Sequence, residues 1–215
     1  MGEIRGMFFW LSGVCTQPLL TLLAQALSQG NGHPVNPLAL PDYDAQVEGL
    51  ITGKIDGLAF CRELNESAEI KGDPAGLRDQ ILDGITPNPG VVEATRLLPE
   101  HIQRWLVVDL PIDWFEKIAG QLELLSCFVP ERIIFLPTSK LQRLIPDAFY
   151  HLAYRAQLPM QECLLIDASA RRAVQALKHG LSTEIFVDTR RLERTFVMRE
   201  FIDRPHPVHK PNTSL

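Results

Sequence analysis

The sequence predicts an α/β protein built on a parallel sheet, because short apolar runs recur between amphipathic segments. Each run spans four or five residues, is rich in Val, Ile, Leu and Phe, and does not alternate between apolar and polar positions. Strands that are buried on both faces, as in a parallel sheet, have this pattern. We therefore expect about five strands, at Met7–Leu11, Trp105–Val108, Arg132–Leu136, Cys163–Ile166 and Glu184–Val187.

Amphipathic segments separate the later runs and predict the helices that cross from strand to strand. Pro146 suits the first position of one helix, and Ser169 suits the N-cap of another. Gly180 suits the position after that second helix, where a left-handed backbone is common. The repetition of strand, helix and strand implies right-handed crossovers and helices on both faces of the sheet. The expected helices are Asp113–Leu124, Pro146–Ala156 and Ala170–His179.

The first two strands are separated by a long segment with no strand pattern. It begins with an apolar helix, Pro18–Gln29, and continues through a loop rich in proline. Three further helical patterns follow, at Tyr43–Thr52, Gly57–Glu66 and Pro74–Leu82. We interpret residues 17–86 as a helical insertion, with the α/β core formed by residues 1–16 and 87–202. The proline-containing residues 203–215 are predicted to be a disordered tail.

The composition is that of an ordinary globular protein. Of 215 residues, 46% are hydrophobic and 22% charged, and the net charge of −5 does not suggest binding to nucleic acid. Arg190, Arg191 and Arg194 are interpreted as the solvated face of a helix. We find neither a signal-peptide pattern nor an apolar stretch long enough to span a bilayer. Four dispersed cysteines suggest reduced thiols, so we expect a cytoplasmic protein without membrane association.

The segment Trp10-Leu11-Ser12-Gly13-Val14 follows the first apolar run and resembles the nucleophile loop of the haloacid-dehalogenase-like (HAD-like) hydrolases. In that family the loop reads Asp, any residue, Asp, Gly, and then Val or Thr. Ile51–Ile55 resembles part of the helical cap that one subgroup inserts after the first strand, and Pro87–Val91 resembles the return to the core. Ile166–Ser169 is similar to the acidic fourth motif. The resemblance covers nearly the whole chain and implies a HAD-like Rossmannoid core with an inserted helical cap.

The resemblance also implies a set of catalytic positions, and most of them are altered here. In the family one Asp attacks phosphorus and a second protonates the leaving group. A Ser or Thr and a Lys hold the phosphoryl group, and an acidic pair helps to bind Mg²⁺. Of these six positions the chain keeps only Asp167. The other five hold residues that cannot perform the role, namely Trp10, Ser12, Val108, Ile145 and Ala168.

These replacements predict that the phosphatase reaction of the family is absent, because such residues act as a unit. We expect no cofactor. Asp167 is a weak candidate ligand for a metal, and residual Mg²⁺ binding is not expected from one carboxylate, since Mg²⁺ prefers several oxygen ligands.

Several residues near the altered positions allow two interpretations. The Trp10 indole either fills the vacated cavity or stacks on a ligand. Asp167 either caps the helix that follows it or belongs to an altered site, and Asp109 is interpreted as a turn or cap residue. Lys140 is either a loop lysine or a cation supplied from a shifted position. The possible cleft residues are Trp10, Ser12, Asp109, Lys140 and Asp167.

Our leading hypothesis is a catalytically inactive HAD-like protein that acts by binding, as a regulatory or structural protein. It would engage a protein partner, a second copy of itself, or a small molecule in the cleft between cap and core. The alternative is a phosphatase-type hydrolase that uses non-standard residues, drawn from Asp167, Asp109, Ser12, Lys140 and Cys15.

Overall fold

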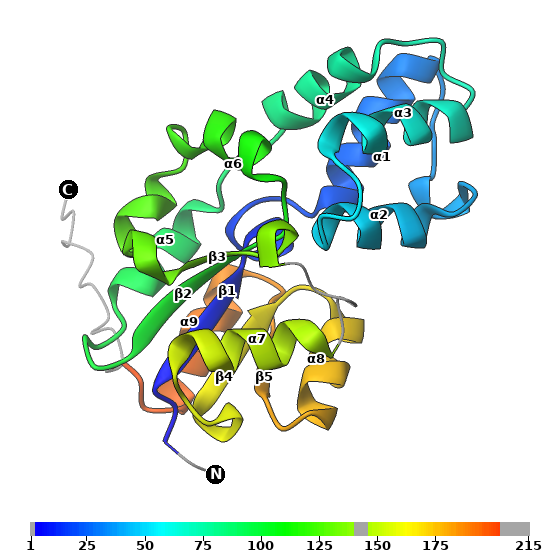
Figure 1. The fold of residues 1–215 in the computed structure, drawn as a ribbon. Coiled ribbons are helices and arrows are strands. Elements are labelled where there is room, and N and C mark those ends of the chain that lie inside the picture. The colour runs from blue at the N-terminus through cyan, green and yellow to red at the C-terminus, as the bar shows by residue number, and fades with distance from the viewer. Residues whose placement is uncertain (1–2, 140–145, 203–215) are drawn as a thin grey trace, which may run out of the picture.

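The chain folds around a five-stranded parallel sheet with strand order β3-β2-β1-β4-β5 (Figure 1). This computed structural model describes residues 3–139 and 146–202. The sheet confirms the predicted α/β fold and places β1 at its centre. The strands are β1 (Gly6–Trp10), β2 (Gln103–Val108), β3 (Ile133–Phe135), β4 (Cys163–Asp167) and β5 (Ser182–Ile185).

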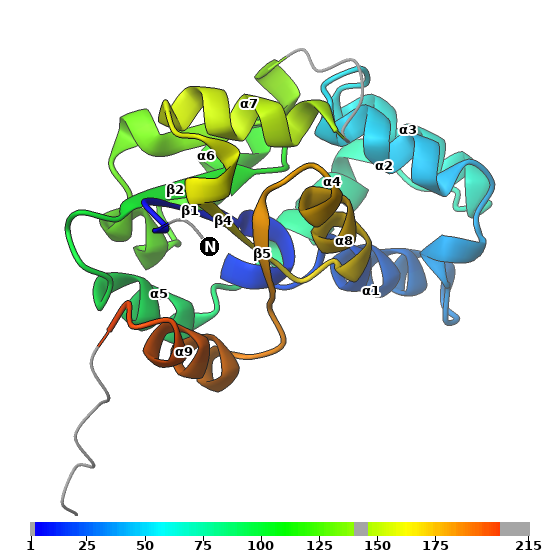
Figure 2. The same cartoon turned by 90° about the horizontal axis from the view of Figure 1, so that it is seen from below.

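Helices cover both faces of the sheet. In Figure 2, α7 lies on one side of the strands, and α5 and α9 lie on the other. Helix α5 packs against α9, and α8 packs against β4 and β5. Arg190, Arg191 and Arg194 are exposed on α9, as expected. The helices are α5 (Pro89–Arg96), α6 (Ile112–Ala119), α7 (Asp147–Ala156), α8 (Ala170–Lys178) and α9 (Thr189–Met198).

The core is densest around the central strands, because β1 and β4 are buried at every position. Phe8 stacks on Trp105 of β2, with ring centroids 6.0 Å apart. Phe9 meets Phe128 edge to face at 5.7 Å. A strand between two neighbours and beneath helices on both faces has no solvated side, which explains its continuous apolar run.

The segment between β1 and α5 forms four α-helices and, in the described residues, no strand (Figure 1). The two ends of this helical insertion run side by side: Thr16 bridges Pro87, and Gln17 Oε1 accepts a hydrogen bond of 2.8 Å from the Thr86 amide. No helix in residues 3–139 or 146–202 is long and apolar enough to cross a membrane. The four helices are α1 (Leu19–Asn31), α2 (Tyr43–Ile51), α3 (Gly57–Ser67) and α4 (Pro74–Asp83).

Some element boundaries differ from the prediction. Strand β5 covers Ser182–Ile185 rather than Glu184–Val187. It is an edge strand and is only half-buried, so it does not need the apolar run that marks a central strand. Helix α6 ends at Ala119, before Gly120, and α5 was not predicted. The predicted tail lies outside the described residues.

Candidate functional site

The candidate site lies at the carboxyl end of the sheet, where β1 turns into the segment Leu11–Cys15. Gly13 has a φ of 95°, which a residue with a side chain rarely adopts. A Cβ atom at Gly13 would also lie 2.9 Å from the Cβ of Ala168. The turn therefore needs glycine for both reasons. It leads the chain past the ends of β2 and β4, which flank β1, and so brings Asp109 and Asp167 toward Trp10.

Asp109 is a buried hydrogen-bond acceptor at the centre of this site, and its side chain is directed at the turn. Its Oδ2 accepts from Trp10 Nε1 at 2.7 Å. Its Oδ1 accepts from the Ser12 hydroxyl at 2.7 Å and from the Ser12 amide at 3.2 Å. Asp109 is 2% exposed. The expectation that it is a turn or cap residue is therefore wrong, and it is Asp109, one residue after Val108, that reaches Trp10 and Ser12.

Asp167 makes a second set of contacts, with the first turn of α8. Arg172 donates to it from two nitrogens, with Nε 2.6 Å from Oδ2 and Nη2 2.8 Å from Oδ1. The Ser169 amide donates to Oδ1 at 2.8 Å. The N-cap of α8 is Ser169, whose hydroxyl accepts from the Arg172 amide, and not Asp167. The capping interpretation of Asp167 is thus wrong, and its main partner is Arg172.

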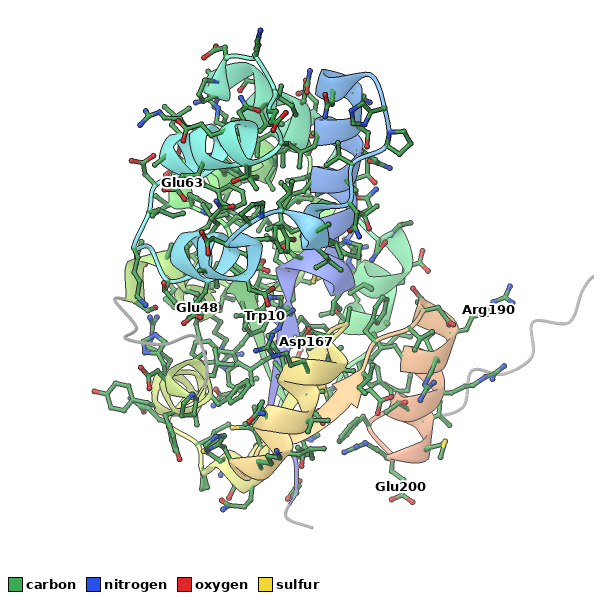
Figure 3. All side chains as sticks on the ribbon, turned by 90° about the vertical axis from the view of Figure 1, so that its right-hand side faces the viewer. Trp10, Glu48, Glu63, Asp167, Arg190 and Glu200 are labelled. Carbon is green, nitrogen blue, oxygen red and sulfur yellow. The ribbon has the colours of Figure 1, made fainter. Side chains whose placement is uncertain are left out.

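Trp10 joins the two sets of contacts. Its indole N–H reaches Asp109, and the Arg172 guanidinium carbon lies 4.4 Å from the centroid of its ring. Trp10 is fully buried, as the cavity-filling interpretation requires. Figure 3 shows Trp10 and Asp167 near each other where the helical insertion meets α8. Sequence reasoning missed Arg172, which lies in the first turn of α8, three residues after the N-cap Ser169.

Burial dominates the electrostatics of the site. It raises the pKa of the Asp109 carboxyl above its ordinary value, although the positive charge of Arg172 and the hydrogen bonds from Ser12 and Trp10 oppose the rise. Burial also acts to lower the pKa of Arg172, but the hydrogen bond and charge of Asp167 and the charge of Asp109 outweigh it and raise that pKa. Arg172 is therefore a permanent cation next to two buried carboxyl groups.

The remaining candidates contribute little to this arrangement. Cys15 is buried, and its pKa is raised well above the ordinary value by burial and by the charge of Asp109, so the thiol is not a thiolate nucleophile. Lys140 and Ile145 lie outside the described residues.

The residues that are present do not fit a Mg²⁺ site. Both oxygens of Asp167 accept hydrogen bonds from Arg172, and both oxygens of Asp109 accept from Trp10 or Ser12. Mg²⁺ requires oxygen ligands in nearly octahedral geometry and is repelled by a neighbouring guanidinium. Over the described part of the chain, no group of three or more His, Cys, Asp or Glu side chains could hold a metal ion.

No family model and no curated protein matches the chain. Its structure is similar to a HAD-family enzyme of Bacteroides thetaiotaomicron in complex with magnesium and inorganic phosphate, at 13% identity and a TM-score of 0.61, covering 85% of this chain and 94% of that one. It is also similar to a HAD-family hydrolase of Deinococcus radiodurans with bound phosphate and sodium, at 12% identity and a TM-score of 0.65, covering 94% and 99%. The L-2-haloacid dehalogenase of Xanthobacter autotrophicus is similar at 14% identity and a TM-score of 0.62, covering 94% of this chain and 85% of that one. The chain therefore has the fold of the HAD-family hydrolases.

Proposed function

We propose that the chain is a catalytically inactive member of the HAD-like superfamily and acts by binding, as a regulatory or structural protein. The observation that carries the proposal is the closed network at the carboxyl end of the sheet. Trp10 stands where the resemblance implies a nucleophilic carboxylate, and both remaining carboxylates are bonded to groups of the chain itself.

The network opposes phosphoryl chemistry in two ways. An indole has no lone pair that can attack phosphorus. Asp167, the one acidic position that is kept, pairs with Arg172 and is fully buried, so its oxygens are not available to a substrate or metal ion. Because nucleophile, acid and metal ligands cooperate, their combined loss lowers activity by many orders of magnitude.

The proposed partner is a protein, either a different chain or a second copy. Trp10 offers no free ring face to a small molecule, since it is fully buried and Arg172 lies over its ring. This argues against a small molecule stacked on the Trp10 ring. Sedimentation velocity of the purified chain tests self-association directly, and a single monomer species at high micromolar concentration would exclude the second copy.

A panel of small phosphoesters, assayed with Mg²⁺, tests the inactivity. We expect the wild type and Asp167→Ala to give the same rate as buffer, while an active HAD phosphatase in the same assay gives turnover. Turnover by the wild type that Asp167→Ala abolishes would refute the proposal.

One contact favours the alternative, a hydrolase with non-standard residues. The Ser12 hydroxyl donates to Asp109 at 2.7 Å, the contact that a general base makes with a nucleophile, and burial raises the pKa of that carboxyl. The pair could activate Ser12 as a nucleophile, although Ser12 is only 8% exposed. Metal-independent turnover that both Ser12→Ala and Asp109→Asn abolish would establish this alternative, and its absence would remove it.

A further inference from the structure

Two carboxyl groups are buried at the ends of neighbouring strands, which is costly unless positive charge compensates them. Asp109 is 2% exposed and Asp167 is 0% exposed. Asp109 is the residue after β2, Asp167 is the last residue of β4, and these two strands lie on either side of β1. Buried charges in proteins are paired with opposite charges or coordinate metal ions. A divalent cation is one way to compensate such a pair.

Here a side chain supplies the charge. The Arg172 guanidinium binds Asp167 through two parallel hydrogen bonds of 2.6 and 2.8 Å, and its side chain is 18% exposed. The same guanidinium lies over the Trp10 ring, and Trp10 donates to Asp109 from the edge of that ring. The planar group therefore neutralises one carboxylate by direct contact and acts on the other through its charge.

We propose that Arg172 is the built-in cation of this site, and that removing its guanidinium leaves Asp167 uncompensated, with Asp109 buried nearby, so that a divalent cation can take the place of the guanidinium. In the wild-type chain the guanidinium excludes such an ion, because it occupies both oxygens of Asp167 and repels positive charge. The proposal concerns only the charge of the site, so it holds or fails independently of whether the chain hydrolyses anything.

The matched substitutions are Arg172→Met and Arg171→Met. Met keeps an unbranched stem that can still cover the Trp10 ring but has no charge. Arg171 lies next to Arg172 on α8, yet its side chain is 82% exposed and its ion pair with Asp44 is 3.8 Å long. Arg171→Met therefore controls for losing an arginine from this helix. Arg172→Lys keeps the positive charge and serves as the conservative variant.

Thermal unfolding of the full chain is measured for each variant with MgCl₂ or MnCl₂, against NaCl of equal ionic strength. We expect the Tm of Arg172→Met to be lower than that of the wild type and to rise by about 5 to 10 °C when the divalent ion is a hundredfold above its dissociation constant. Wild type, Arg171→Met and Arg172→Lys should not respond. A stable Arg172→Met that ignores both metals, or a wild type that responds equally, would overturn the proposal.

A double variant covers the case in which Arg172→Met does not fold. Asp167→Asn together with Arg172→Met removes both partners of the ion pair, so no unpaired charge remains at the end of β4. We expect the double variant to fold and to be insensitive to the metals. If it also fails to fold, Arg172 acts through packing rather than through charge, and the proposal is wrong.

Discussion

At the scale of single residues, the carboxylate of Asp109 holds the site together by accepting hydrogen bonds from its neighbours. Its two oxygens receive three donors, two from Ser12 and one from Trp10, in a buried position. A carboxylate can satisfy all of them because it carries only acceptors. The carboxylate thereby fixes both the indole and the turn, although burial disfavours its charge.

Asp109→Asn tests this function. An amide presents one acceptor and one donor, so in either orientation a donor faces Trp10 or Ser12. We expect the free energy of unfolding at pH 7 to fall by about 1–3 kcal/mol, as for a buried group left without its hydrogen bond. Urea denaturation measures the change. The control is Asp113→Asn on the exposed surface of α6, which should change stability by no more than about 0.5 kcal/mol.

The stability difference between the wild type and Asp109→Asn should depend on pH. The pKa of Asp109 in the folded chain lies above its ordinary value of 3.8, so between these two pKa values the folded state binds more protons than the unfolded state. The contribution of Asp109 to stability therefore increases as the pH falls through that window. Urea denaturation of both proteins from pH 7 to pH 4 should show the difference growing, and a difference that shrinks would contradict the pKa shift.

At the scale of elements, the helical insertion meets the core through a close approach of α3 to α6. Gly57 is the first residue of α3, and a Cβ atom there would lie 2.3 Å from Nε1 of the buried Trp114. Trp114 also meets Phe60 edge to face, with centroids 6.4 Å apart. The chain approaches itself as closely at Gly53, where an added Cβ atom would lie 2.0 Å from the Pro137 carbonyl oxygen.

We therefore expect Gly57→Ala to destabilise the chain. The added methyl must displace either α3 or a large side chain of the core, which costs about 1–3 kcal/mol. Gly76→Ala in α4 is the matched control, because nothing lies within 4 Å of its Cβ position. That change should stabilise the helix by up to about 1 kcal/mol. Equal effects of the two substitutions in thermal denaturation would show that the contact with Trp114 is not tight.

The two central strands that are buried throughout are readily predicted from the sequence. Strands β1 and β4 are buried on both faces, so their apolar runs identify them. Strand β5 is a half-buried edge strand, and its position was predicted two residues too late. Helix α5 was missed because Pro89 and Gly90 at its start suggest a loop. The contact between Arg172 and Asp167 depends on the direction of a side chain from a helical turn, which spacing alone does not reveal.

At the scale of the whole molecule, the closed network is formed by residues at the ends of three strands rather than by one residue. The turn after β1, the residue after β2 and the end of β4 each contribute to the closed network, and Arg172 joins two of them. The fold of the HAD-family hydrolases is retained around this network. The network therefore lies at the carboxyl end of a sheet with this fold, and its groups bond to one another.

On the proposed function, introducing the two carboxylates of the HAD-family loop should not produce activity. Trp10→Asp together with Ser12→Asp places four carboxylates near one another, but Arg172 still holds Asp167, and the positions of Val108 and Ala168 remain without functional groups. We expect no Mg²⁺-dependent hydrolysis of p-nitrophenyl phosphate above the wild-type rate, because catalytic groups that act as a unit are not recovered singly. Circular dichroism establishes that the variant is folded before the assay. Turnover by this variant would mean that carboxylates in the loop are sufficient for the reaction, and that the network around Arg172 does not prevent it.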